Sequence, residues 1–418
     1  MITNSIRTDF SASDTRSAIL QPRAFLLMSS TERKAIDSLT NVDDSTVRIL
    51  TILEAHSVTG PAKAVFEFAR EANDSAGQPK MNLSILTFVR GQQENSFIRA
   101  VRERGLPLDV VSEKGRFDFS VIRQLRAAVS RRRPHIIWTN SVKSHFLVRL
   151  AGLHRQAKWI AWHHGYTTTD WRARAYTYLD YWSLPAAARL VTVCDKFARD
   201  LSGRRIPADR ITVEHMPLRR SERPAPAVAA ALRRDWGIES TAPVILTVGR
   251  LSKEKGHSEL LKAFQIVKKS NAAAELVVVG SGPELQRLQA LGSELGLEGS
   301  IHFLGQQDDV RPAYAIADVF VLSSHSEGSP NVLLEAMDSG VPIVATAVGG
   351  VPEIVADEVT AILVQKHDVA GIAAGVIRLL GDADLRSRLI HGSREVLDRH
   401  SPEQYYRRLA AVFQEVAG

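Results

Sequence analysis

The chain has 418 residues, of which 44% are hydrophobic and 24% charged, and it carries one cysteine, Cys194. This length and composition predict two or three folded domains and exclude a wholly disordered protein. A single cysteine excludes an internal disulfide and a thiolate metal cage, so a reducing cytoplasm is the expected location. No apolar run approaches the roughly 18 residues that a membrane-spanning helix needs.

The charges are unevenly spread along the chain. Residues 1–220 contain 34 Lys and Arg against 21 Asp and Glu, whereas residues 221–418 contain 19 against 25. Opposite balances in the two halves predict two domains with different partners. The basic half, which includes the run Arg131–Arg133, suits phosphates, anionic lipid or nucleic acid. The same run also suits the C-terminal end of a solvated helix.

Residues 1–45 show no sustained periodicity and predict a mobile, disordered tail. Beyond them, apolar runs of strand length alternate with helical patterns, first at 47–53, 83–86, 135–138, 159–162 and 190–193. A proline- and alanine-rich segment, 221–242, predicts a linker. A second series has runs at 244–248, 276–279, 319–322 and 342–345. This alternation predicts an α/β protein with two doubly wound, Rossmann-like parallel sheets, at 46–220 and 243–400.

The segment 326–335 directly follows one of the predicted strands. Ser329 has N-cap chemistry and Pro330 suits the first helical position, so we expect a helix to start there. Its positive dipole end then lies at the carboxyl edge of the sheet, where an anion binds favourably. Glu327 precedes this helix and Glu335 lies about two turns into it, so the two carboxylates suit different parts of an elongated ligand. The alternative is an acidic loop residue and a solvated helix face.

A second group of candidate residues follows the first strand of the second domain. Gly249 permits a backbone turn, and Arg250 and Lys255 place two cations at a strand's carboxyl end, where they suit a diphosphate. The alternative is surface salt bridging with Glu254. A nearby G-x-G at Gly280 lacks the third glycine of a dinucleotide fingerprint and predicts a tight turn instead.

In the first domain, Gly60 follows the opening strand and allows close approach of a sugar or phosphate to the backbone. His163 and His164 follow another strand; we expect His163 to be structural and His164 to touch the substrate. No H-x-x-x-H or H-E-x-x-H spacing occurs, so the sequence predicts no metal site and no cofactor.

Together these residues resemble the retaining GT-B glycosyltransferases of family 4, also called glycosyl transferases group 1. The resemblance covers the chain from about Val47 to its end. It is carried by E-x7-E at Glu327 and Glu335, by Gly249, Arg250, Lys255 and Gly256, and by the run 349–353. It implies a GT-B fold, with two Rossmann-like domains facing a cleft and a C-terminal helix, 401–418, that crosses back onto the first domain.

The resemblance also implies roles for single residues. Glu335 would bind the ribose hydroxyls, and Glu327 and His164 the donor sugar. Arg250 and Lys255 would neutralise the diphosphate in place of a metal, and Gly60 would face the phosphates. Further donor contacts, mostly through backbone N–H groups, are implied for Gly249, Gly328, Ser329, Asn331 and Val332. Two sites depart from the family's pattern, Gly60-Pro61 and His215-Met216-Pro217.

The expected function is therefore transfer of a hexose from a UDP- or GDP-sugar to a glycan or lipid-linked acceptor, in polysaccharide or glycolipid synthesis. The expected partners are the donor, the acceptor and an anionic membrane surface on the cytoplasmic side, without nucleic acid. Two alternatives stay open, a GT-B nucleotide-sugar epimerase or hydrolase and a non-catalytic sugar-nucleotide-binding scaffold.

Overall fold

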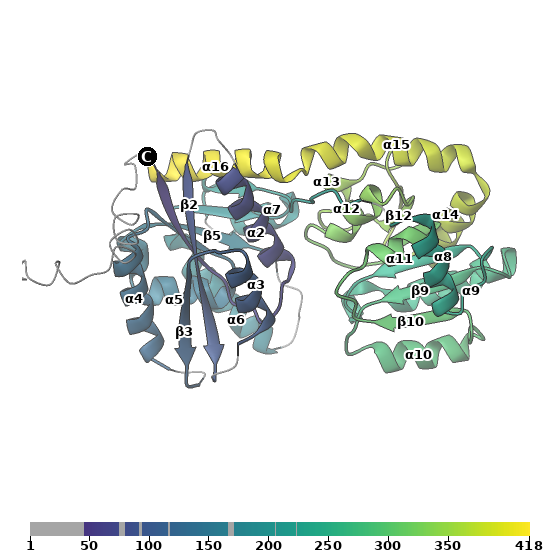
Figure 1. The fold of residues 1–418 in the computed structure, drawn as a ribbon, viewed down its shortest axis with the longest axis horizontal. Coiled ribbons are helices and arrows are strands. Elements are labelled where there is room, and N and C mark those ends of the chain that lie inside the picture. The colour runs from purple at the N-terminus through teal and green to yellow at the C-terminus, as the bar shows by residue number, and fades with distance from the viewer. Residues whose placement is uncertain are drawn as a thin grey trace, which may run out of the picture. The chain divides into compact units, whose positions relative to one another are not determined.

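A computed structural model describes residues 46–74, 80–91, 94–115, 118–165, 171–204, 206–222 and 224–418. The tail predicted for residues 1–45 lies outside these ranges. The residues from Val47 onward form one compact unit that contains two parallel sheets. Both sheets alternate with helices along the chain, which confirms the predicted α/β class (Figure 1).

The first sheet has the strand order β3-β2-β1-β4-β5-β6-β7, and every pairing is parallel. Its central strands are buried on both faces, because aromatic and aliphatic side chains from the flanking helices cover them. The strands are β1 (Val47–Ile52), β2 (Met81–Arg90), β3 (Leu108–Glu113), β4 (Ile136–Thr139), β5 (Lys158–His163), β6 (Arg189–Thr192) and β7 (Ile211–Val213). The helices are α2 (Gly60–Asp74), α3 (Ser96–Glu103), α4 (Ser120–Arg132), α5 (Val142–Leu150), α6 (Trp171–Ser183) and α7 (Asp195–Ser202).

The second sheet has the order β10-β9-β8-β11-β12-β13 and is also parallel throughout. Two apolar clusters cover its two faces. The strands are β8 (Val244–Val248), β9 (Glu275–Val279), β10 (Ile301–Gly305), β11 (Val319–Leu322), β12 (Ile343–Thr346) and β13 (Ile362–Val364). The helices are α9 (His257–Ser270), α10 (Leu285–Glu294), α11 (Arg311–Ile316), α12 (Asn331–Asp338), α13 (Val351–Ile354), α14 (Val369–Gly381) and α15 (Ala383–Arg399).

The segment predicted as a linker contains a helix, α8 (Pro226–Asp235). Leu232 of this helix and the following Trp236 pack against the core of the second sheet. Arg233 donates to the carbonyl of Ile316 over 2.9 Å, which fixes the helix against α11. Part of the expected linker is therefore an integral piece of the second domain.

The last helix, α16 (Pro402–Ala417), packs against the first sheet although it follows the second one in the chain. Its buried face contributes Tyr405, Leu409 and Phe413 to the first domain's core. The ring of Phe413 lies 5.3 Å from those of both Phe68 and Trp138. This burial ties the C-terminal end of the chain to α2 and β4.

Two buried histidines make stability sensitive to acid. Burial lowers the pKa of His257 and of His400 to about 4, so both are neutral at pH 7. Because an unfolded histidine titrates near 6.5, the unfolded chain binds more protons between about pH 6.5 and 4. We expect the free energy of unfolding in urea to fall as pH drops through this window, by at most about 3 kcal/mol per histidine. His257→Gln should reduce this pH dependence, whereas replacement of the exposed His391 should leave it unchanged. A wild-type free energy of unfolding that does not change between pH 6.5 and 4 would contradict the prediction.

Candidate functional site

Glu327 lies in the loop between β11 and α12, and its side chain is 7% exposed. One carboxylate oxygen, Oε1, accepts hydrogen bonds from Lys255 Nζ over 2.7 Å and from Ser324 Oγ over 2.6 Å. Two residues predicted separately therefore form a buried ion pair. Since Lys255 pairs with Glu327, the alternative of a surface salt bridge with Glu254 is wrong for this residue. The pair fixes a negative and a positive charge side by side at the carboxyl edge of the second sheet.

The glycine run after β12 explains how the Glu327 loop packs so closely. A Cβ added at Gly349 would lie 1.8 Å from the carbonyl oxygen of Glu327, and one at Gly350 would lie 2.0 Å from that of Gly328. Any larger residue at either position would push this loop away. Gly349 and Gly350 thus set the position of the loop that carries Glu327.

Glu335 lies on α12, where Tyr314 Oη donates to its Oε2 over 3.2 Å. This is the one hydrogen bond that its side chain makes within the described residues, although an ionised carboxylate can accept about four. Burial raises the pKa of Glu335, and the positive charge of Lys63 opposes that rise. The carboxylate is therefore partly buried with spare acceptor capacity, which suits a pair of ligand hydroxyl groups.

The start of α12 differs from the prediction. The helix begins at Asn331, its N-cap is Pro330, and no side chain in the described part of the chain caps it. Ser329 does not cap the helix, because its hydroxyl accepts a hydrogen bond from the backbone N–H of Met216 over 3.3 Å. The N-terminal end of α12 therefore keeps uncapped N–H groups, as an anion site requires.

Asn331 and Gly60 lie close together. A Cβ added at Gly60 would be 3.9 Å from Nδ2 of Asn331, and the Oδ1 atom of Asn331 is buried without a partner among the described residues. Gly60 is the first residue of α2 rather than a loop residue. Pro61 consequently stands in the first helical turn, where a missing N–H removes no intrahelical hydrogen bond. The carbonyl oxygen of Val332 lies 3.1 Å from Tyr314 Oη and shares that hydroxyl's single proton with Glu335.

Arg250 follows β8 and is exposed. With Gly249 and the turn 280–283 it lines a cavity of about 470 Å³. Gly280 has a φ of +141°, and a Cβ there would lie 1.8 Å from the carbonyl oxygen of Gly249. The G-x-G pair thus allows the loops after β8 and β9 to touch, which agrees with the predicted tight turn. Arg250 and Lys255 both come from the segment after β8, but the structure gives them different surroundings.

His164 follows β5 and its ring stacks on that of Trp162, with centroids 5.7 Å apart and planes 8° apart. Its Nε2 atom is buried with no hydrogen-bond partner among the described residues. Burial, with smaller effects from His163 and His145, lowers the pKa of His164 to about 3. A neutral imidazole with a vacant nitrogen suits a hydroxyl partner rather than a phosphate.

The loop of Glu327 lies against the loop of His164. A Cβ at Gly328 would be 3.1 Å from the ring of Phe197 and 3.6 Å from the carbonyl oxygen of His164. His163, by contrast, is buried, and its Nδ1 lies 3.4 Å from the carboxylate of Asp180. The expectation of a structural His163 beside an available His164 fits this arrangement.

A larger cavity, of about 880 Å³, includes Glu335 and Asn331 in its lining. Lys63 and Tyr314 also line it, and sequence reasoning singled out neither. Lys63 lies three residues after Gly60, so its closeness to that predicted site residue could have pointed to it. Tyr314 lies 21 residues before Glu335, so no local pattern connects the two.

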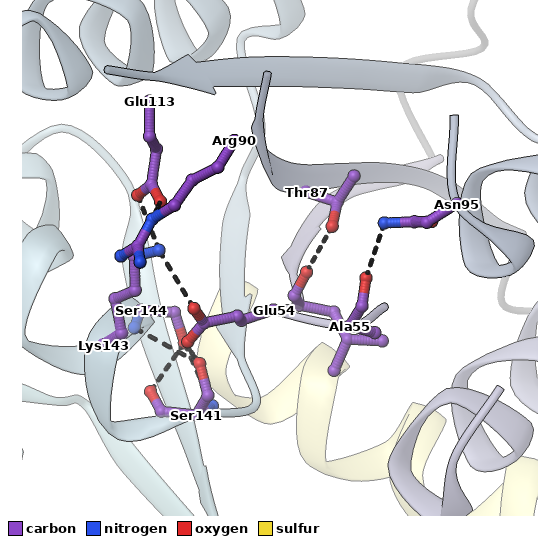
Figure 2. A network of polar contacts seen from close by, with 10 residues as sticks. Glu54, Ala55, Thr87, Arg90, Asn95, Glu113, Ser141, Lys143 and Ser144 are labelled. Atoms are coloured by element: carbon purple, nitrogen blue, oxygen red, sulfur yellow. Dashed lines mark hydrogen bonds and ion pairs between the residues drawn. The ribbon is translucent and has the colours of Figure 1, made fainter. Parts of the chain in front are cut away.

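The carboxyl edge of the first sheet carries a polar network that sequence reasoning also missed. Figure 2 shows Lys143, at the start of α5, between Glu54 and Glu113, with Nζ–O distances of 3.0 and 2.6 Å. Arg90 Nε lies 3.2 Å from the same Glu113 carboxylate. These charges come from β2, β3, the loop after β1 and the start of α5, which follows β4, so the parallel strand order brings them together. The two carboxylates and the two cations pair with one another and form a polar rim at this edge.

Comparison with known proteins agrees with this geometry. The family described as "Glycosyl transferases group 1" matches residues 229–396, and the family "Glycosyl transferase 4-like domain" matches residues 59–216. The chain belongs to the group 1 glycosyltransferases. The segment 59–216 contains every strand of the first sheet except β1, and the segment 229–396 contains all strands of the second sheet.

Among curated relatives, N-acetyl-alpha-D-glucosaminyl L-malate synthase of Bacillus anthracis is 31% identical over 186 residues, which are 44% of this chain and 49% of the relative. The lipopolysaccharide core biosynthesis glycosyltransferase LpsE of Rhizobium meliloti is 34% identical over 170 residues, covering 41% and 49%. The chain thus matches about half the length of these relatives.

A solved structure, Anabaena Alr3699/HepE in complex with UDP and glucose, superposes with a TM-score of 0.75 at 17% identity. The superposition covers 88% of this chain and 99% of that one. At this identity the likeness establishes the fold, which is GT-B.

Proposed function

We propose that this protein is a retaining, metal-independent hexosyltransferase that uses a UDP- or GDP-sugar as donor. The observation that carries the proposal is the buried Glu327, which Lys255 and Ser324 hold by hydrogen bonds. On the helix that follows, the carboxylate of Glu335 has free hydrogen-bond acceptor positions. The spacing of these two carboxylates is the family's most specific motif, and each has the environment that its role requires.

In the proposed reaction, Glu335 accepts hydrogen bonds from the ribose hydroxyls. Arg250, Lys255 and the uncapped N-terminal end of α12 neutralise the diphosphate. Glu327 and His164 bind hydroxyls of the sugar. The acceptor oxygen attacks the anomeric carbon from the face that the diphosphate leaves. The bond from that carbon to phosphate oxygen breaks, and the acceptor proton passes to the leaving phosphate.

We assign donor binding to residues 243–400 and the acceptor to residues 46–220. The basic first half favours an acceptor at an anionic membrane surface, on the cytoplasmic side. Among the described residues, no helix combines the length and apolarity that crossing a bilayer demands. The named functions of the relatives, including lipopolysaccharide core biosynthesis, support a glycan or lipid-linked acceptor.

The direct test measures release of UDP or GDP from a panel of nucleotide sugars, with and without glycan and lipid-linked acceptors. Acceptor-dependent release, with an α-linked product from an α-linked donor, is the expected result. Release without an acceptor would favour the epimerase or hydrolase, and binding without any release would favour the scaffold.

The proposed charge neutralisation by side chains predicts that transfer needs no divalent cation. We expect EDTA to leave the initial rate of transfer unchanged below the unfolding temperature. Added Mg²⁺ or Mn²⁺ should not increase that rate. Loss of activity in EDTA that Mg²⁺ restores would contradict metal-independent transfer.

A further inference from the structure

Three potential metal ligands meet outside the proposed transfer site. Glu259 lies in the first turn of α9, His325 in the loop after β11, and His367 in the turn after β13. One ligand atom from each side chain lies within 4.8 Å of the other two. The two imidazole rings are in contact, with centroids 4.1 Å apart. Two imidazoles and a carboxylate are a donor set that divalent transition metals prefer.

The distances within this cluster suit a tetrahedral ion. Nε2 of His325 lies 3.3 Å from Oε1 of Glu259, and Nδ1 of His367 lies 3.2 Å from the same oxygen. Tetrahedral Zn²⁺ with ligand bonds of roughly 2.0–2.1 Å separates neighbouring ligand atoms by about 3.3–3.4 Å. Both nitrogen–oxygen separations are therefore close to those that a shared ion requires, and the ligand atoms of the two histidines lie within 4.8 Å of each other.

Hydrogen bonding inside the protein does not account for the whole cluster. The contact between Glu259 and His367 has the geometry of a hydrogen bond. Nε2 of His325, however, is buried and has no hydrogen-bond partner among the described residues, although it lies near the carboxylate. A buried nitrogen without such a partner is costly unless another group satisfies it.

The backbone around the cluster holds the ligands in place. His367 has a φ of +66°, a left-handed conformation that is uncommon for a residue other than glycine. Gly256 also has a positive φ, and a Cβ there would lie 2.9 Å from Nε2 of His325. The backbone N–H of His325 donates to the carbonyl of Glu254 over 2.7 Å. These features position two ligands beside Glu259.

We propose that Glu259, His325 and His367 bind one divalent transition-metal ion, with Zn²⁺ the best match and water as the fourth ligand. The side chain of His367 is 55% exposed, so the ion reaches the cluster from solvent. Because His325 lies two residues before Glu327, the ion ties α9 and the turn after β13 to the loop that carries Glu327. Its role is structural and separate from the transfer step.

Cobalt(II) titration of the full-length protein tests this site, because tetrahedral Co²⁺ absorbs in the visible range. We expect one Co²⁺ per chain, displaced by Zn²⁺, and a Tm that rises when Zn²⁺ is added. His367→Asn, which tolerates a left-handed turn, and His325→Gln should weaken Co²⁺ binding by at least about tenfold. Glu259→Gln should abolish the Zn²⁺-dependent rise in Tm.

The matched control is His391→Asn, which removes an exposed histidine from α15 of the same domain. It should leave the cobalt spectrum and the affinity unchanged, and circular dichroism should show that every variant is folded. The proposal is overturned if the wild-type protein gives no tetrahedral cobalt spectrum. It is equally overturned if the ligand variants bind Co²⁺ as tightly as the control.

Discussion

Replacing Glu335 with alanine is expected to weaken binding of the nucleotide by about 2–4 kcal/mol, roughly 30- to 1,000-fold in Kd. The reason is that the carboxylate offers its free acceptor positions to two ribose hydroxyls, and hydrogen bonds to charged groups contribute about 1.5–3 kcal/mol each. The fold should survive, because Tyr314 Oη also lies 3.1 Å from the carbonyl of Val332 and keeps a partner. Isothermal titration with UDP and GDP measures the effect.

A matched control for this experiment is Glu298→Ala, which removes an exposed carboxylate from the same domain. Binding by the wild-type protein should also weaken on acidification, with a midpoint above the 4.5 that is ordinary for a glutamate, since burial raises the pKa of Glu335. Unchanged affinity in Glu335→Ala would remove the ribose role from this residue.

Replacing Arg250 and Lys255 together with alanine is expected to lower kcat by roughly 10²- to 10³-fold or more, with a much smaller change in donor Kd. Negative charge grows on the diphosphate as its bond to the sugar breaks, so cations placed there stabilise the transition state more than the bound donor. Single-turnover rates and equilibrium binding of the same donor separate the two effects.

The two cations need different controls. Lys255→Ala leaves the buried Glu327 without its ion-pair partner, and breaking such a pair costs about 3–5 kcal/mol of stability. Lys255→Arg keeps the charge and separates folding from catalysis.

Arg250 is exposed, so Arg250→Ala should leave Tm nearly unchanged while lowering kcat. Lys253→Ala, which changes an exposed cation in the 3₁₀ turn Lys253–Lys255, is the matched control with no expected effect. A double variant with the wild-type kcat would refute the role of both cations.

The strands that the sequence did not predict share one position in the fold. β3 and β7 are the edges of the first sheet, and β10 and β13 are the edges of the second. An edge strand has a neighbour on one side and is less completely covered, so it needs no continuous apolar run. All residues of β7 and β10 are indeed only partly buried, whereas the predicted central strands are buried throughout most of their length.

The site could be predicted where its chemistry lies within a few neighbouring residues. E-x7-E and the segment after β8 each fit in a window of about ten residues, and the structure brings Glu327 and Lys255 into contact. The predicted start of α12 was wrong by one residue, because the helix begins at Asn331 and not at Pro330. Ser329 has the chemistry of a cap, but a tertiary hydrogen bond from Met216 takes its hydroxyl.

Neighbouring residues alone were therefore enough to establish two parallel α/β sheets, the family and the positions of its carboxylates and cations. Packing decided which side chains from distant segments of the chain come into contact. Three groups join residues at or after the carboxyl ends of different strands: the contact of Tyr314 with Glu335, the cluster of Glu259, His325 and His367, and the polar rim around Lys143. A parallel sheet places the carboxyl ends of its strands along one edge in an order that differs from the order in the chain. Which side chains meet along that edge depends on strand order and loop conformation. Neither of these can be predicted from the spacing of residues that are close in sequence.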